Sequence, residues 1–372
     1  MKQFVSLVLA LCLACGLAAP ALADIALREA PLTHEAPPEI GAPEDLALNK
    51  GEGPLSGSCG ATAADDVKWQ LTQNNTDIDD PTYTLTISGT GAMADFSNDH
   101  PWRSFKEKIT EVVIESGVEK IGGNAFRDHI SITTVTLSET LTKIGHHAFF
   151  KTDIAHISIP NSVKQIEYCA FEGCSKLENI AIPDSVTDLG GRTFYACTTL
   201  ESASIGSGIS ALSDAIFYGC TALKTVILSA GLTSIGRVIP GGNYAAATFG
   251  NCSSLESIQL PSSVTTIGIY AFNGCTALCA IDLSPVTTIQ AYSFLGCTSL
   301  QTVKLGNGLT HIGEYAFQDC QLENICFPDS LEKIEMGAFK GNDLTVISCY
   351  YIFVPWFMAA SHRHGTSRCL NC

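Results

Sequence analysis

Cysteine is the residue type whose number and spacing first suggest chemistry in this sequence of 372 residues, which contains 16 of them. Seven lie three residues after a phenylalanine in consecutive repeats: Cys174, Cys197, Cys220, Cys252, Cys275, Cys297 and Cys320. Zinc requires ligands that converge on one point, whereas one thiol per repeat gives a straight column, and parallel side-chain directions suit disulfide geometry poorly. We therefore predict buried, reduced thiols that act as small core residues and donate a weak S–H bond to a turn carbonyl. Towards the ends of the array His129, Thr152 and Asn342 take this position, as expected of fraying or capping turns.

A second cysteine pattern closes the chain, where Cys369 and Cys372 form a C-x-x-C pair preceded by His362 and His364. The spacing is typical of zinc or redox sites, but no second ligand pair accompanies it. We therefore predict no metal site.

Motifs of enzymes are missing from the sequence. It contains no G-x-S-x-G, no H-E-x-x-H, no phosphate-binding G-x-x-x-x-G-K and no G-x-G-x-x-G at the start of a helix. Histidines and carboxylates occur at variable repeat positions, where we expect them to face solvent: His146, His147, Glu167, Glu314 and Glu335. We predict no catalytic residues, no cofactor and no enzymatic activity.

The elements that position these residues are repeats. Ten phenylalanines recur at intervals of 22 or 23 residues, with one interval of 32: Phe126, Phe149, Phe171, Phe194, Phe217, Phe249, Phe272, Phe294, Phe317 and Phe339. Each repeat has too few apolar residues to close a core alone, but enough to bury one face against copies above and below it. The chain is therefore expected to stack into one solenoid rather than fold into two or three globular domains.

Each repeat contains a short strand pattern, as in Leu177-x-x-Ile180-x-Ile182-Pro183, where apolar residues alternate and a proline ends the strand. We predict a leucine-rich-repeat type solenoid of about ten repeats, with one short parallel β-strand per repeat, many turns and little helix. The glycines of the recurring Ile-Gly step are expected to adopt positive φ in a tight bend; they are Gly122, Gly145, Gly236, Gly268 and Gly313.

The repeats resemble a known family. The segment from Ile166 to Ser185, with its Ala-Phe-x-x-Cys-x-x-Leu-x-x-Ile-x-Ile-Pro pattern, is similar to the BspA-type leucine-rich repeats of secreted and surface proteins. Residues 58–102, with Ser88-Gly89-Thr90-Gly91 and Pro101-Trp102, look like the N-terminal capping segment of bacterial members. The resemblance implies the solenoid fold and an association with adhesion to host matrix proteins, but it names no ligand.

The N-terminus indicates the compartment. Met1-Lys2 is followed by an apolar run from Phe4 to Leu17 and by the small-x-small signal Ala21-Leu22-Ala23, which is typical of a secretory signal peptide. We predict five parts: a signal peptide (1–23), a proline-rich acidic linker (24–57), a capping segment (58–117), the solenoid (118–347) and a divergent tail (348–372). The protein is expected to be secreted or on the cell surface, with no transmembrane segment in its mature chain.

Two columns of outward-facing residues on the predicted sheet form the candidate ligand-binding surface, since they alternate with the buried positions. The first contains His156, Asn179, Ser202, Thr225, Ser257, Thr302 and Asn324, and the second Gln259, Asp282 and Lys304. Two interpretations of these small polar residues stay open: ladders that stabilise stacking, or a platform for a protein or glycan. The long interval near residue 240 predicts a projecting loop. It is either a neutral connection or a contact loop, in which Arg237 and Tyr244 are the side chains best suited to contacts.

The net charge of −16, from 37 acidic and 21 basic residues, excludes a nucleic-acid binder, because phosphate affinity comes from clustered Lys and Arg. The main hypothesis is a non-catalytic protein that adheres to an extracellular protein or glycan. The alternative is a structural module that self-associates at the cell surface and has no dedicated ligand.

Overall fold

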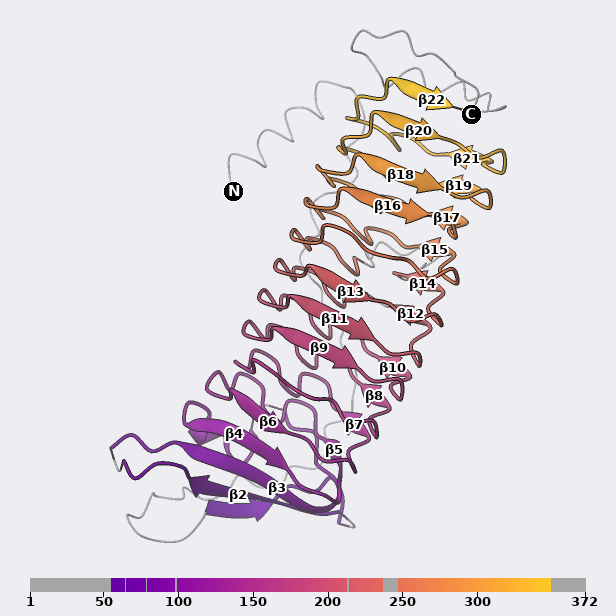
Figure 1. The fold of residues 1–372 in the computed structure, drawn as a ribbon. Coiled ribbons are helices and arrows are strands. Elements are labelled where there is room, and N and C mark those ends of the chain that lie inside the picture. The colour runs from indigo at the N-terminus through magenta and orange to yellow at the C-terminus, as the bar shows by residue number, and fades with distance from the viewer. Residues whose placement is uncertain are drawn as a thin grey trace, which may run out of the picture. The chain divides into compact units, whose positions relative to one another are not determined.

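The structure, a computed structural model, describes residues 55–348 apart from residues 64, 78, 98, 213 and 237–246. In this part the chain forms a β-solenoid, a stack of short rungs (Figure 1). We number the rungs 1 to 10 after the phenylalanines from Phe126 to Phe339. The predicted signal peptide, the linker before Leu55, the loop residues Arg237 and Tyr244, and the tail after Ser348 lie outside the described residues.

One ladder of parallel strands runs along the face that Figure 1 turns toward the viewer, and we call it the face ladder. Its strands are β4 (Ile109–Ile114), β6 (Thr134–Thr136), β9 (Asn179–Ile182), β11 (Ser202–Ile205), β13 (Thr225–Ile227), β16 (Ala280–Leu283), β18 (Thr302–Leu305), β20 (Asn324–Cys326) and β22 (Val346–Ser348). The strands are parallel and in register, so that Asn179, Ser202 and Thr225 stand in one column. Rung 2 joins only through single bridges at His156, and rung 6 has no strand here.

A second ladder, which sequence analysis did not predict, follows the first within each rung. It consists of β5 (Val118–Ile121), β7 (Lys143–Ile144), β8 (Gln165–Ile166), β10 (Asp188–Leu189), β12 (Ala211–Leu212), β14 (Ser234–Ile235), β15 (Thr266–Ile267), β17 (Thr288–Ile289), β19 (His311–Ile312) and β21 (Lys333–Ile334). Most of these strands have only two residues, of which the second is a buried or partly buried Ile or Leu. A two-residue strand leaves no alternation for a sequence pattern to reveal.

The N-terminal segment starts both ladders. Strands β1 (Leu55–Ser58), β2 (Asp66–Gln73) and β3 (Tyr83–Ala92) pair antiparallel in that order. The ten-residue β3 then pairs in parallel with β4 through its first half and with β5 through its last residues. The 3-10 helix η1 (Arg103–Phe105) is the only helix in the described residues. Trp102, just before it, is fully buried and stacks on Phe126.

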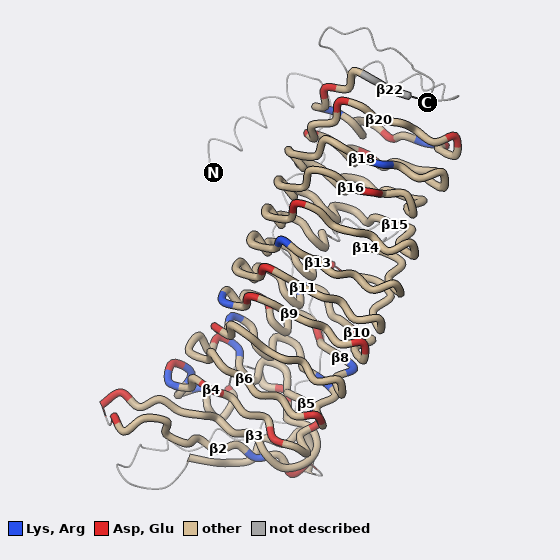
Figure 2. Tube along the Cα trace, in the orientation of Figure 1, with Lys and Arg blue, Asp and Glu red and all other residues tan. Residues whose placement is uncertain are grey.

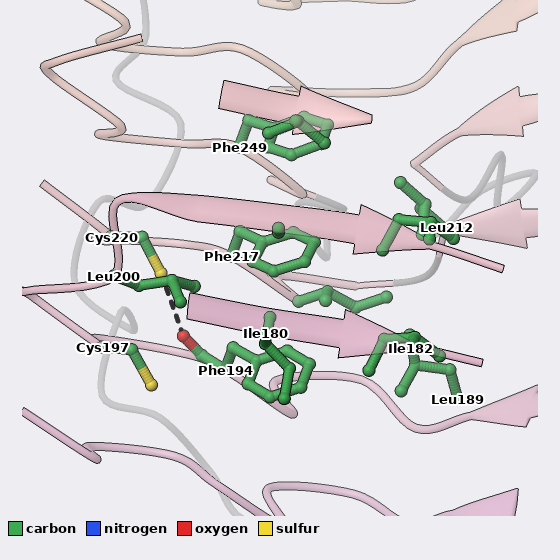
Figure 3. Close-up of a cluster of buried hydrophobic side chains, with 14 of the residues drawn as sticks. Ile180, Ile182, Leu189, Phe194, Cys197, Leu200, Leu212, Phe217, Cys220 and Phe249 are labelled. Atoms are coloured by element: carbon green, nitrogen blue, oxygen red, sulfur yellow. Dashed lines mark hydrogen bonds between the residues drawn. The ribbon is translucent and has the colours of Figure 1, made fainter. Parts of the chain in front are cut away.

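The core is a continuous stack of phenylalanine rings. Consecutive ring centroids from Phe126 to Phe339 lie 5.0–5.6 Å apart, and every ring except that of Phe339 is fully buried. Ile180, Ile182 and their counterparts in other rungs pack against this stack (Figure 3). Phe217 and Phe249 are still 5.5 Å apart, so the longer interval between them leaves the stack unbroken.

The cysteine column lies beside the phenylalanines, as predicted. All seven thiols are buried, and each donates to the carbonyl of the phenylalanine one rung below, at 3.1–3.3 Å; Figure 3 shows the bond from Cys220 to Phe194. Burial raises the pKa of Cys220 to about 12. None of the cysteines that the structure describes is in a disulfide.

The expectation of fraying at the ends of the column is wrong for two of its three positions. His129 and Thr152 are fully buried. Thr152 Oγ1 donates to the carbonyl of Phe149 at 3.0 Å, and Asn342 Nδ2 reaches the carbonyl of Phe317 at 2.7 Å, where a cysteine would donate. These polar side chains are tolerated because turn carbonyls satisfy them.

The predicted positive φ of the Ile-Gly glycines holds only for Gly236 (φ 83°). At Gly145 and Gly313 a Cβ would lie 2.6 and 2.4 Å from backbone nitrogens of the rung below. At Gly122 and Gly268 it would lie 1.7 and 2.8 Å from other backbone atoms. These glycines allow rungs to approach each other. The left-handed residues are instead the second residues before and after the phenylalanines: Asn124, Asp128, His147, Lys151, Cys169, Gly173, Arg192, Ala196, Ala215, Gly219, Asn251, Tyr270, Gly274, Tyr292, Gly296, Tyr315, Asp319, Gly337 and Gly341.

Candidate binding surface

The candidate surface is the outer side of the face ladder, which the alternation within each strand creates. In β9 the pattern is exposed, buried, exposed, buried, so Asn179 and Ala181 point outward while Ile180 and Ile182 enter the core. The register places the outward residues of successive rungs beside each other, with Ala181 next to Ser204 and Ser204 next to Ile227. The surface therefore consists of two straight columns of mostly small side chains.

All ten predicted binding residues of these columns lie on this outer side, and all are exposed except the partly buried Ser202. His156, Asn179, Ser202 and Thr225 are brought together on rungs 2 to 5. The other six occupy rungs 6 to 9, where Ser257 and Gln259 stand on the rung without a face strand.

Some of these residues satisfy one another. Ser202 Oγ donates to Asn179 Oδ1 at 2.5 Å, and Lys304 Nζ lies 2.9 Å from Asp282 Oδ2. Hydrogen bonds from Ser284, together with Lys304, lower the pKa of Asp282 to about 2. Both groups of this pair are largely exposed, so its contribution to stability is small. No such bond connects His156 or Thr225 to its column neighbours in the described chain.

A groove of about 760 Å³ runs along this face over rungs 1 to 5. His156, Asn179, Ser202 and Thr225 line it, together with Ser158, Asn161, Ala181, Pro183, Ser204 and Ile227. None of its lining residues is Lys, Arg, Asp or Glu, and Figure 2 shows little charge on this part of the ladder. A volume of this size lies within the range of about 300–1,000 Å³ found for ligand sites.

The groove lies beside an irregular rung of the face ladder. Residues 157–160 of rung 2 belong to no strand, and only His156 forms bridges to the rungs on either side. The neighbouring outward residues Ser158, Ala181 and Ser204 are too small to fill the space above the backbone. Small side chains beside an irregular rung thus make a hollow next to the regular strands β9, β11 and β13.

Ile227 belongs to the second outward column, but it was not selected from the sequence as a candidate binding residue. Its side chain points outward in the second column and is 63% exposed, one of four large apolar residues that are exposed in the described chain. A β-branched apolar residue at an outward strand position is the signal that could have identified it.

Carboxylates flank the groove at both ends of the strands. Glu178 and Glu201 directly precede β9 and β11, and their side chains are 56% exposed. Glu178 Oε2 lies 3.7 Å from Nε2 of His156, and Lys224 Nζ lies 3.1 Å from Oε1 of Glu201. Asp184, exposed after the lining residue Pro183, accepts a hydrogen bond from the Ser207 backbone N–H, which lowers the pKa of its carboxyl.

The groups that were expected to face solvent are less exposed than predicted. Burial and nearby Arg127 lower the pKa of His147 to about 4. Glu167 accepts hydrogen bonds from His146 and Lys143, which lower its pKa to about 2, and Glu335 accepts from the Glu314 backbone N–H at 3.1 Å. These carboxylates link neighbouring rungs, because each takes a backbone donor one rung below.

Titratable groups elsewhere in the described residues are scattered or buried in pairs. Among these residues, no three His, Cys, Asp or Glu side chains are arranged to hold a metal ion. His100 and His129 are buried, with their Nε2 atoms 3.3 Å apart. Within the same part of the chain no helix is long and apolar enough to cross a membrane.

The family model of the BspA type leucine rich repeat region matches residues 103–224 and 244–345, in six copies. Similar solved structures include a leucine-rich repeat protein from Eubacterium ventriosum (23% identity, 82% of this chain and 98% of that chain, TM-score 0.41). Another comes from Bacteroides ovatus (20%, 75% and 87%, 0.44). A third is a leucine rich cell surface protein from Faecalibacterium prausnitzii (21%, 81% and 90%, 0.33). Among curated proteins, none matches the sequence.

Proposed function

The chain belongs to the family of proteins built from BspA-type leucine-rich repeats, and from this premise we propose that it is a non-catalytic binding protein that adheres to an extracellular protein or glycan. The signal-peptide pattern of residues 1–23 supports secretion or display at the cell surface. We assign no cofactor and no catalytic residue to it.

The observation that carries this proposal is the groove on the face ladder. Four of the residues selected from the sequence, His156, Asn179, Ser202 and Thr225, line it, and no Lys, Arg, Asp or Glu lies among the lining residues. Thr302, Asn324, Ser257, Gln259, Asp282 and Lys304 extend the same face beyond the groove. Solenoids use such extended surfaces to bind other macromolecules.

The test is a binding screen of the purified chain on immobilised extracellular matrix proteins and on a glycan array. Ala181→Trp serves as the blocking variant, because its outward side chain would fill the groove without entering the core. We expect at least one ligand whose binding to wild type falls at least tenfold with Ala181→Trp. Ala211→Trp, at the exposed residue of β12 in the second ladder, is the matched control and is expected to keep binding.

Light scattering of the same samples tests the competing function. Concentration-dependent assembly without any bound ligand would favour a self-associating structural module and contradict the proposal. Because every copy carries a net charge of −16, self-repulsion at low ionic strength opposes such assembly, and we expect no assembly there.

A further inference from the structure

We infer that the groove over rungs 1 to 5 receives a polypeptide that presents an apolar side chain next to Lys or Arg. The inference rests on the proposed function, since it names the class of partner for the same surface. Three features of the groove support it: its apolar floor, the carboxylates that flank it and the scarcity of aromatic side chains among its lining residues.

The floor favours an apolar side chain. Ile227 is 63% exposed at one end, and Ala181 and Pro183 lie among the other lining residues. Covering this area removes apolar surface from water, which is favourable by about 25 cal/mol per Å². A partner side chain seated between Ile227 and Ala181 would occupy the kind of desolvated pocket in which binding hot spots occur.

The rims favour positive charge. Glu178 and Glu201 directly precede β9 and β11, two of the strands that line the groove, and Asp184 lies after β9, so that carboxylates flank the groove on both sides. Only Glu201 has a close lysine partner among these three, Lys224 at 3.1 Å. Because the lining itself carries no formal charge, the field at the groove comes from its rims and from a chain of net charge −16. Complementary potentials of this kind steer partners and select against like charge.

A polypeptide fits better than a glycan. Sugar rings pack their C–H faces on aromatic rings, and among the lining residues only His156 carries an aromatic ring. The small residues Ser158, Ala181 and Ser204 instead allow the backbone of an extended peptide to approach the sheet closely. Hydroxyl and amide groups of Asn179 and Thr225 can then bond to its peptide groups.

The experiment uses a library of random peptides displayed on phage and selected on the immobilised full chain. Enriched peptides are synthesised, and their affinities are measured by fluorescence anisotropy. We expect peptides of net positive charge that contain an apolar residue beside Lys or Arg. Their binding should fall at least tenfold with Ala181→Trp, and also with Ser204→Trp, a second filling variant that covers the case in which the first fails to fold.

The charge component has its own matched pair of variants. Glu178→Gln combined with Glu201→Gln should weaken binding about threefold to tenfold and reduce its dependence on salt. Glu119→Gln combined with Glu332→Gln removes the same charge from exposed positions in β5 and directly before β21 and should change affinity less than twofold.

The outcomes separate the two proposals. Peptides that lose binding with Ala181→Trp but lack Lys and Arg, or are insensitive to Glu178→Gln with Glu201→Gln, would overturn the cationic partner and leave the proposed function in place. Groove-dependent binding of a glycan, with no peptide recovered, would overturn the polypeptide. If peptides and glycans both bound to Ala181→Trp and to Ser204→Trp as well as to wild type, the inference and the proposed function would be overturned together.

Discussion

At the scale of single residues, the cysteine column shows how a buried thiol stabilises a repeat. Cys220 is fully buried, and its Sγ lies 3.1 Å from the carbonyl of Phe194 in the rung below. Cys220→Ala removes this donor and a small buried volume, so we expect unfolding free energy to fall by about 1–2 kcal/mol. The measurement is urea denaturation followed by circular dichroism. Cys279→Ala is the control, because Cys279 is exposed; an equal loss there would contradict the assigned role of the buried bond.

The glycines offer a second test at this scale, because two of them are needed for different reasons. Gly296 has φ 72°, and a Cβ added there would meet nothing within 4 Å, so Gly296→Ala should cost about 1–2 kcal/mol through backbone strain alone. Gly313 has ordinary φ, but its Cβ would lie 2.4 Å from the backbone nitrogen of Ala291. We expect Gly313→Ala to cost more, since neighbouring rungs must separate. Comparison of the two urea midpoints checks this, and the reverse order would contradict it.

Residue types explain why sequence reasoning succeeded for the thiols and failed for the glycines. A cysteine that recurs at one offset from a phenylalanine must repeat one environment, and the structure confirms that environment. A glycine after isoleucine is equally compatible with positive φ and with close backbone approach, and sequence alone does not distinguish them. The left-handed position two residues after the phenylalanine carries a signal that was overlooked, because Gly, Asn or Asp occupies it in eight of the ten repeats. The position two residues before the phenylalanine holds residues as different as Asn124, Arg192 and Tyr270, so its composition gave no signal.

At the scale of elements, the junction between the N-terminal segment and the first rung contains a buried histidine pair. His129 Nδ1 lies 3.1 Å from the carbonyl of Arg127, which makes this nitrogen the donor and leaves Nε2 to accept from Nε2–H of His100. Burial lowers the pKa of His100 to about 3 and that of His129 to about 4. Neither ring is therefore charged in the folded protein at neutral pH.

This pair predicts acid sensitivity of the junction. Because both pKa values are depressed below the unfolded value of about 6.5, the unfolded chain binds protons first, so stability present above pH 6.5 is lost as pH falls toward 4. Each histidine contributes a slope of up to about 1.4 kcal/mol per pH unit in this window. His129→Cys, which restores the residue of the column, combined with His100→Leu should flatten the slope. Urea midpoints from pH 8 to pH 4 measure it; equal slopes in both proteins would contradict the prediction.

The elements also show what sequence reasoning could and could not give for the candidate surface. Alternation in strands such as β9 placed the outward columns correctly. The groove was not predictable from the sequence. Ile157-Ser158-Ile159-Pro160 follows the same pattern as Ile180-Ala181-Ile182-Pro183, yet only the second segment lies in a strand, β9, up to its proline. A hollow arises from how neighbouring rungs pair, and no single repeat contains that information.

At the scale of the described solenoid, each rung contacts only its neighbours, through the phenylalanine stack and the two ladders. Stability is then close to a sum of rung and interface contributions. Two rungs can be joined at equivalent positions of the repeat. Gly274-Cys275 and Gly296-Cys297 are such positions, because each pair follows its phenylalanine at the same distance along the chain. Deletion of residues 275–296 therefore joins Gly274 to Cys297 and removes one complete rung.

We expect this whole-rung deletion to fold, because Phe272 can stack on Phe317 with the cysteine column and both ladders kept in register. Its circular dichroism spectrum should retain the wild-type shape, with a lower urea midpoint because one set of interfaces is lost. Deletion of residues 275–285 alone removes β16 but keeps β17, so the phenylalanine and cysteine columns can no longer align with the second ladder. We expect that shorter deletion to expose the following rungs to limited proteolysis. If the two deletion variants were equally resistant to proteolysis, loss of register would have no effect on the fold. Whole rungs would then not be its structural units.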